Sequence, residues 1–224
     1  MQLMDSYFIE DNTIRFNYDF DEPLTEEIYK IFESVEEIDF GIKFNQPLFF
    51  PPLLNITTIH FSRDFNQSLD LSNLYNLEFI SFGYYFNQSL ALLPVNIKRI
   101  SLSINFNQKV DNLPNNLKFI MFSANFNQTV DLLPNSLSEV YFGLNFTQNV
   151  DNLPNSITYI SFWKLCQSLD NLPDSVQRID IREIDLEKPI KINKLPASLK
   201  TLKLVDKYLD IKTVLEKQFL SYFL

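Results

Sequence analysis

Hydrophobic and polar positions follow one short pattern that returns along most of the chain. An apolar residue, two variable residues, an apolar residue, one variable residue and a further apolar residue make up Ile97–Leu102 and Leu137–Phe142. The alternation at the end of each run predicts a short strand with one face buried. Because the run recurs about every 20 residues, each unit predicts one coil of a solenoid whose strands stack into a parallel sheet.

Two further motifs recur in register with these runs. Phe-Asn-Gln triplets, or Phe-Thr-Gln in the last case, begin at Phe44, Phe65, Phe86, Phe106, Phe126 and Phe146. Leu-Pro pairs begin at Leu93, Leu113, Leu133, Leu153, Leu172 and Leu195. We expect the phenylalanines to stack from coil to coil into an aromatic spine. Proline fixes φ and removes a donor, so the Leu-Pro pairs favour an extended return with little helix on the convex side.

Polar positions at fixed phases add two expectations. We expect the recurring glutamines to form a polar ladder, at Gln46, Gln67, Gln88, Gln108, Gln128, Gln148 and Gln167. Asn105, Asn125 and Asn145 follow their strands and complete the pattern L-x-x-L-x-L-x-x-N, which is typical of leucine-rich repeats. Their amides are expected to bond backbone groups that the turn leaves unpaired. The three glycines, Gly41, Gly83 and Gly143, share the phase just after the strand and indicate a turn geometry there.

These patterns predict a leucine-rich-repeat-like solenoid, mainly β, with parallel strands on its concave face and about ten repeats of 20–21 residues. We expect residues 1–224 to form a single domain. Residues 1–34 would be an N-terminal cap with an atypical first repeat, 35–205 the repeats and 206–224 a C-terminal cap. Thr25 before two glutamates predicts a short helix near residues 25–32. The apolar residues of 209–224 predict a terminal helix that covers the last coil.

The triplets, the Leu-Pro pairs and the strands between them resemble the FNIP-repeat family, over roughly residues 35–205. The resemblance implies a solenoid and an origin in a giant DNA virus or a social amoeba. Many viral members carry an N-terminal F-box, which recruits a ubiquitin ligase. We expect no F-box here, because the first repeat begins near residue 11. The family implies no catalytic residues.

Charge and rare residues narrow the classes of function. The net charge of −9 disfavours nucleic acid and anionic membranes as partners. A single cysteine, no signal peptide and no apolar run long enough to cross a bilayer favour a cytoplasmic protein, in the host cytoplasm if viral. One histidine, His60, and one cysteine, Cys166, cannot make a Cys/His zinc set. We expect no metal, cofactor or catalytic residue, although two close carboxylates with raised pKa values would indicate an enzyme.

The variable strand positions are expected to project outward, because side chains alternate along a strand. Phe79, Phe119, Met121, Tyr141 and Tyr159 then form an apolar stripe over the middle coils, with Trp163 at its rim. Exposed aromatic and Met residues are enriched in protein interfaces, whereas aromatics at strand positions also favour sheet formation by themselves. The candidate partner-binding residues are Phe79, Arg99, Phe119, Met121, Glu139, Tyr141, Tyr159 and Trp163.

The sequence therefore predicts a non-catalytic scaffold that binds a protein partner on the concave face. Acidic Glu36, Glu37 and Asp39 at one end and basic Arg178, Lys200 and Lys203 at the other would orient that partner. Two alternatives stay open. One is a substrate-recognition component of a ubiquitin ligase without its own F-box. The other is a self-associating structural protein, a homodimer through the stripe or the terminal helix.

Overall fold

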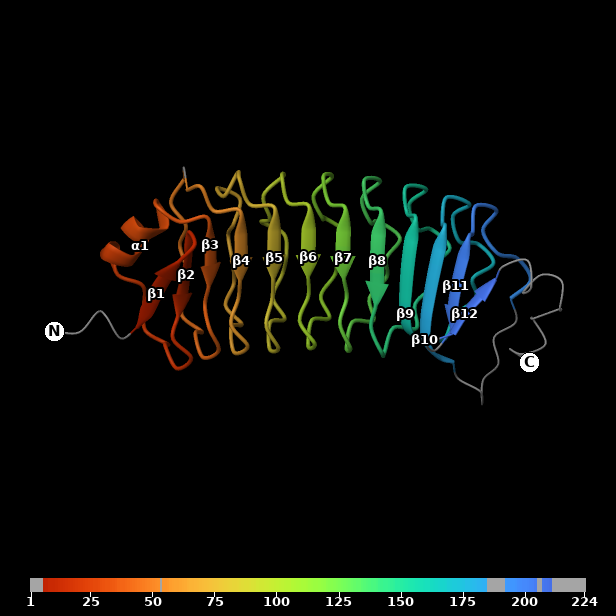
Figure 1. Ribbon diagram of the computed structural model, residues 1–224, viewed down its shortest axis with the longest axis horizontal. Helices are drawn as coiled ribbons and strands as arrows, with labels where there is room; N and C mark the ends of the chain where they lie inside the picture. Colours follow the sequence, from red (N-terminus) through yellow and green to blue (C-terminus); the bar gives the residue numbers. More distant parts are fainter. Residues whose placement is uncertain (1–5, 53, 185–191, 205–206, 211–224) are drawn as a thin grey trace.

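The computed structural model describes residues 6–52, 54–184, 192–204 and 207–210, and its strands form one 12-stranded sheet in chain order (Figure 1). The strands that pair in parallel are β2 (Thr13–Phe16), β3 (Glu37–Asp39), β4 (Thr58–His60), β5 (Phe79–Ser81), β6 (Arg99–Ser101), β7 (Phe119–Met121), β8 (Glu139–Phe142), β9 (Tyr159–Leu165), β10 (Arg178–Ile184) and β11 (Thr201–Leu204). They are the rungs of a solenoid of about nine turns, which confirms the predicted architecture.

Each short strand turns one side chain inward and its neighbours outward. In β5, β6 and β7 the central residues Ile80, Ile100 and Ile120 are fully buried, while the flanking residues are half-buried or exposed. The rows are in register, since Ile80 pairs with Ile100 and Ile100 with Ile120. The predicted alternation is therefore confirmed, and it fixes which side chains face solvent.

Two columns of stacked phenylalanine rings fill the interior. The triplet phenylalanines stack as predicted, with ring centroids 6.1–6.3 Å apart from Phe44 through to Phe146. A second column, which we did not predict, consists of the last apolar residue of each run. Its contacts join Phe40 to Phe61, Phe61 to Phe82, Phe122 to Phe142 and Phe142 to Phe162, at 5.3–5.8 Å. Near-parallel stacking of this kind adds to the energy of simple burial.

The Leu-Pro pairs end each return with a tight turn. Leu113 is buried, and the carbonyl of Pro114 accepts a hydrogen bond from the N–H of Leu117 at 3.1 Å. The next coil repeats this contact between Pro134 and Leu137 at 3.0 Å. The turn brings the chain from the return into the following strand without a helix. Within the part of the chain that the structure describes, the helix is α1 (Glu26–Phe32), so the expected scarcity of helix is confirmed.

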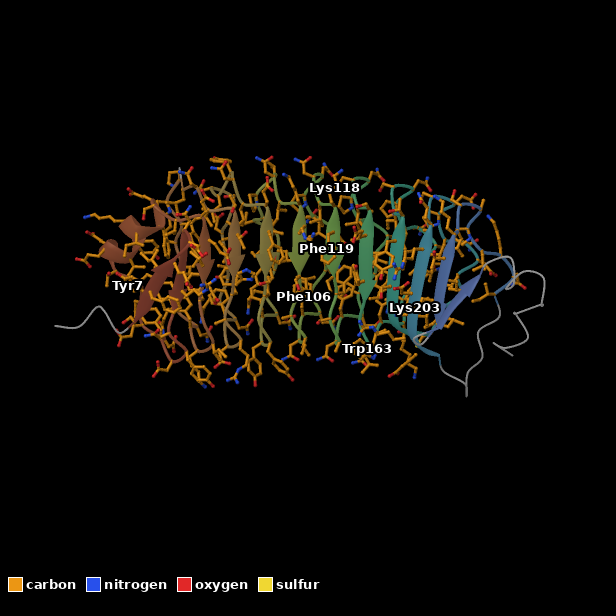
Figure 2. The ribbon with its side chains drawn as sticks, viewed as in Figure 1. Tyr7, Phe106, Lys118, Phe119, Trp163 and Lys203 are labelled. Atoms are coloured by element: carbon orange, nitrogen blue, oxygen red, sulfur yellow. The ribbon has the colours of Figure 1, made fainter. Side chains whose placement is uncertain are left out.

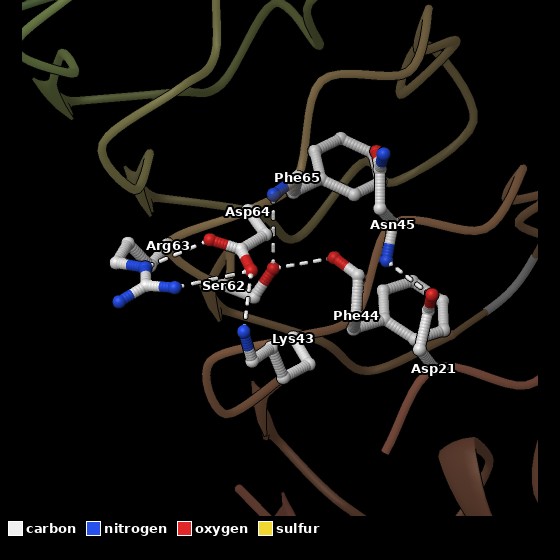
Figure 3. Close-up of polar contacts among 8 residues, drawn as sticks. All are labelled: Asp21, Lys43, Phe44, Asn45, Ser62, Arg63, Asp64 and Phe65. Carbon is white, nitrogen blue, oxygen red and sulfur yellow. Dashed lines mark hydrogen bonds and ion pairs between the residues drawn. The ribbon is translucent and has the colours of Figure 1, made fainter. Parts of the chain in front are cut away.

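A polar ladder of glutamines and asparagines runs along the solenoid. Asn45 Oδ1 accepts from the backbone N–H of Asn66 at 2.9 Å and from Gln67 Nε2 at 3.2 Å. The same arrangement recurs in later coils as far as Asn127. The predicted ladder is present, and from Gln67 to Gln148 each of its glutamines donates to the asparagine of the preceding coil. Asp21 begins the ladder, its carboxylate accepting from the backbone N–H of Asn45 at 2.8 Å (Figure 3).

The asparagines after the strands form a second ladder. Asn125 Nδ2 donates to Asn105 Oδ1 at 2.9 Å, and Asn145 Nδ2 donates to Asn125 Oδ1 at 3.0 Å. We expected these amides to bond the backbone of their own turns. They bond one another instead, because the parallel stacking of coils places like residues one above the next.

The phase just after the strand is crowded between coils. A Cβ at Gly143 would lie 1.9 Å from the carbonyl oxygen of Ser123, and Gly83 has the same relationship to Ser62. Only Gly41 has a positive φ, +68°, so the predicted turn geometry holds there and is wrong for the other two. Two of the serines at this phase, Ser62 and Ser103, are buried and donate to carbonyl groups inside the solenoid. Ser62 Oγ donates to the carbonyl of Phe44 and accepts from the N–H of Phe65 (Figure 3).

Antiparallel strands close both ends of the sheet. At the N-terminal end β1 (Tyr7–Glu10) pairs with β2 through a two-residue turn in which Asp11 and Asn12 both have positive φ. This hairpin was not predicted. The predicted helix α1 is confirmed, and Thr25 caps it by accepting from the N–H of Ile28. At the other end β12 (Lys207–Asp210) pairs with β11. The predicted terminal helix is wrong over residues 209–210, which belong to β12, and residues 211–224 lie outside the described residues.

Candidate partner-binding site

Four of the predicted stripe residues come together as a row across β5 to β9, in which Arg99 joins Phe79 to Phe119. The guanidinium of Arg99 lies 4.5 Å from the centroid of the Phe119 ring and 6.0 Å from that of Phe79. Tyr141 lies 5.1 Å from Phe119 on one side and 5.1 Å from Tyr159 on the other. We call Phe79, Arg99, Phe119, Tyr141 and Tyr159 the aromatic row. Phe119 lies near the middle of the sheet in Figure 2.

The members of the aromatic row hold one another in place. The rings of Phe79, Phe119, Tyr141 and Tyr159 are all half-buried, because each covers part of its neighbour. A guanidinium stacked on an exposed ring contributes roughly 0.5–1 kcal/mol. The row is therefore an ordered surface whose side chains lose little freedom when something binds to it.

An ion pair fixes the C-terminal end of the row. The Arg178 guanidinium donates two hydrogen bonds to the Asp180 carboxylate, of 2.8 and 2.7 Å. The Tyr159 hydroxyl donates to the same carboxylate at 3.1 Å. Burial, with the nearby Asp180 carboxylate, raises the pKa of Tyr159. Burial opposes ionisation of Asp180, but hydrogen bonds from Arg178 and Tyr159 outweigh it and hold its pKa below the ordinary value. Tyr159 therefore stays a hydrogen-bond donor and Asp180 an anion.

Sequence reasoning missed the role of Asp180. Arg178 and Asp180 are two residues apart on one strand, so they share a face, and this spacing was a signal for their pairing. The pairing has a consequence for the predicted polarity of the solenoid. Part of the expected basic end is neutralised, because the charge of Arg178 is matched by that of Asp180.

The remaining candidate residues lie beside the aromatic row. Glu139 stands between Phe119 and Tyr159 in the strand register. Burial of Tyr141, together with the Glu139 carboxylate, raises the pKa of that tyrosine. Met121 pairs in register with Tyr141 and lines a groove below the row.

This groove lies where β7, β8 and β9 end, and its volume is about 330 Å³. Small residues line part of it, at Ser123, Ala124 and Gly143, and leave room between larger side chains. The larger lining residues include Ile104, Met121, Tyr141, Leu144 and Trp163. The Trp163 side chain is 43% exposed, and Figure 2 shows it at the lower edge of the sheet. The groove thus connects Trp163, which was predicted to lie at the rim of the stripe, to the aromatic row through Tyr141.

The groove exists because β9 continues beyond the position at which the preceding strands β7 and β8 end in a turn. Between Phe162 and Gln167 the chain has one residue fewer than between Phe142 and Gln148. Strand β9 extends to Leu165, which is buried. Trp163 follows Phe162, which pairs in register with Phe142, so it stands at the phase where earlier coils have serine or glycine. Arg182, from the equally long β10, lies 4.7 Å from the Trp163 ring.

Other candidate chemistry lies elsewhere. His60 is half-buried on β4, with Nδ1 2.7 Å from Ser81 Oγ and Nε2 3.3 Å from Glu37 Oε1. Within the described ranges, no three His, Cys, Asp or Glu side chains are grouped so as to hold a metal ion. A second hollow, of about 720 Å³, lies where the strands begin, and its lining includes the paired side chains of Glu78 and Lys98.

Comparisons with known proteins agree with this geometry. The solved structure of CroV588, described as a novel circular LRR protein and coming from a giant virus, superposes with a TM-score of 0.52 at 27% sequence identity. The match covers 89% of this chain but 41% of CroV588, so the chain spans about two fifths of the length of that protein. The fold is therefore that of a leucine-rich-repeat-like solenoid.

Part of the repeat region also matches a family model. The FNIP Repeat model matches residues 106–145 and 126–165, which run from the triplet after β6 to the end of β9. Over these coils the chain is similar to FNIP repeats, and the resemblance seen in the sequence is confirmed there. No curated protein matches the sequence. Among the described residues, no helix has the length and apolar character needed to span a membrane.

Proposed function

We propose that this chain is a non-catalytic scaffold that binds a protein partner on its sheet face, through the aromatic row and Trp163. The observation that carries the proposal is the continuous contact from Arg99 through Phe119 and Tyr141 to Tyr159 on an outward face. Aromatic and arginine side chains dominate binding energy in protein interfaces. An ordered row of them presents such groups in advance, which lowers the entropic cost of binding.

The carboxyl groups support a binding role over catalysis. A carboxyl group that acts as a general acid near neutral pH needs a raised pKa. Where the pKa of a described Asp or Glu departs from its ordinary value, the shift is downward. These residues are Asp64, Asp70, Asp170 and Asp180. A binding scaffold needs no cofactor.

The nature and place of the partner follow from charge and cysteine usage. The net charge of −9 favours a protein over nucleic acid or an anionic membrane. The single cysteine suits a reducing compartment, so we place the complex in the cytoplasm, that of the host if the protein is viral.

The test is affinity capture from a native host extract with three forms of the chain. The double variant Phe119→Glu with Tyr141→Glu adds charge to the aromatic row. Leu132→Glu, at a residue 64% exposed in a return segment, is the control. We expect wild type and control to capture the same proteins and the double variant to lose them while still unfolding in one cooperative thermal transition. Equal capture by all three would refute the site.

Sedimentation of the same proteins separates self-association from partner binding. If wild type forms a dimer that the double variant cannot form, and no other protein is captured, the occupant of the face is a second copy and the proposal fails. A wild type that sediments as a monomer while capturing a host protein supports it.

A further inference from the structure

We propose that the groove at the ends of β7, β8 and β9 receives one bulky apolar side chain of a partner peptide, and that Arg182 binds a carboxylate next to it in that peptide. The inference rests on the proposed function and names the chemistry of the partner. The occupant is a segment in which an aliphatic or aromatic residue stands beside an aspartate or glutamate.

The size and lining of the groove fit an apolar side chain. Its volume of about 330 Å³ is at the lower end of the range for ligand sites, about 300–1,000 Å³. Ile104, Leu144 and Trp163 are 38%, 39% and 43% exposed, which is unusual for large apolar residues that lie together. Covering them would remove this apolar surface from water, which is the main source of affinity in such pockets.

The floor and the walls come from different coils, so the groove is specific to this part of the solenoid. At the phase after the strand, β7 and β8 are followed by Ser123 and Gly143, and Gly143 has no room for a side chain. In β9 the same phase carries Trp163. An abrupt change from no side chain to an indole ring produces a step in the surface, and a partner side chain fits against that step.

The charge of Arg182 indicates which residue stands beside the apolar one in the partner peptide. Arg15, Arg63 and Arg178 each form an ion pair with a carboxylate of their own neighbourhood. No carboxylate of the residues that the structure describes pairs with Arg182, which lies on the Trp163 ring instead. A guanidinium stacked in this way keeps its N–H donors at the ring edge, where they can form two parallel hydrogen bonds with a carboxylate.

The experiment selects ligands from a phage-displayed library of random short peptides on the full chain. We expect enriched peptides to share an apolar residue next to Asp or Glu. The consensus peptide, labelled with a fluorophore, is then titrated by anisotropy against wild type, Trp163→Ala, Arg182→Glu and the control Lys118→Glu. Lys118 lies at the opposite ends of the strands from Trp163 (Figure 2).

Arg182→Glu should weaken binding of the consensus peptide by roughly tenfold or more, since a close charge pair contributes at least that much. A second peptide with Lys in place of the acidic residue should prefer Arg182→Glu over wild type. Trp163→Ala should weaken both peptides, and Lys118→Glu neither.

Three results would overturn the inference: no enriched peptide, enriched peptides without a carboxylate, or equal binding by wild type and Arg182→Glu. These outcomes are distinct from failure of the proposed function. If host capture is lost on changing Phe119 and Tyr141 but is unaffected by Arg182→Glu, the scaffold function stands and the groove motif does not.

Discussion

Gln167 lies one coil beyond Thr147, and the polar ladder that runs from Asp21 through Asn127 ends between them. Thr147 stands where the ladder has asparagine, and its hydroxyl donates back to Asn127 Oδ1 at 3.2 Å. It therefore offers the next coil no amide oxygen. Gln167 Oε1 accepts from the N–H of Cys166, whereas its Nε2 is buried and, among the described residues, has no hydrogen-bond partner. A buried donor without a partner lowers the stability of the fold.

Thr147→Asn should therefore stabilise the protein. The introduced asparagine would place its Oδ1 where Gln167 Nε2 can reach it, as Asn127 does for Gln148 at 3.2 Å. We expect a gain of about 1 kcal/mol in the free energy of unfolding, which corresponds to a rise in Tm of roughly 2–4 °C for a chain of this size. Urea unfolding followed by circular dichroism measures the gain.

The glutamines themselves supply the control for this account. Gln167→Met removes the unpaired donor and should be neutral or stabilising. Gln148→Met removes a paired donor and leaves Asn127 with one bond fewer, so it should destabilise by about 1 kcal/mol. Equal losses from the two methionine variants would contradict the assignment of Gln167 as the unpaired member.

Gly143→Ala should destabilise strongly, because the coils approach each other too closely for a methyl group. The added Cβ would lie 1.9 Å from the carbonyl oxygen of Ser123, so adjacent coils must separate. We expect a loss of about 2–3 kcal/mol in the free energy of unfolding. Ser123→Ala, which keeps a Cβ at the same phase of the preceding coil, is the matched control and should lose much less. A Gly143→Ala protein with wild-type stability would show that the coils are spaced more widely than described.

Asp180→Asn should lower stability at neutral pH and have little effect in acid. The pKa of Asp180 in the folded state is below its ordinary 3.8, so the folded protein binds the proton less tightly than the unfolded chain. Its stabilising effect is therefore present above pH 3.8 and is lost as the pH falls through the depressed value. We expect a loss of about 1–2 kcal/mol at pH 7.

Chemical unfolding of wild type and Asp180→Asn from neutral pH down to about pH 2.5 measures the difference in their stabilities. Asp131→Asn, where the carboxylate accepts from the Asn152 amide and not from a guanidinium, is the control. If the stability difference between wild type and Asp180→Asn stayed constant through acid pH, the Arg178–Asp180 pair would not be its source.

The solenoid could be predicted from the sequence because its signals are local and repeated. The alternation around Ile100 and Ile120 fixes the inward face of each strand, and the triplet phenylalanines return at a constant spacing. The outward row followed from the same alternation. The N-terminal hairpin was missed, although Asp11 and Asn12 are residue types that favour two-residue turns. A single short turn has no repetition to draw attention to it.

The groove could not be predicted for a different reason. It depends on a one-residue shortening after Phe162 that prolongs β9, and on the placement of Arg182 over Trp163 from the next strand. Neither is a property of one repeat. The partners of the glutamines were also missed, because the choice between a neighbouring glutamine and a neighbouring asparagine depends on how far each side chain reaches across the gap between coils.

Site-specific photo-crosslinking tests the central claim most directly. A photoreactive phenylalanine analogue replaces Tyr141 in one protein and Leu132 in another, and both are irradiated in extract of the native host. Our account predicts a discrete adduct with a single partner protein from position 141 and none from position 132. Adducts of the same protein from position 132, with none from position 141, would show that the partner binds a return segment and not the sheet face.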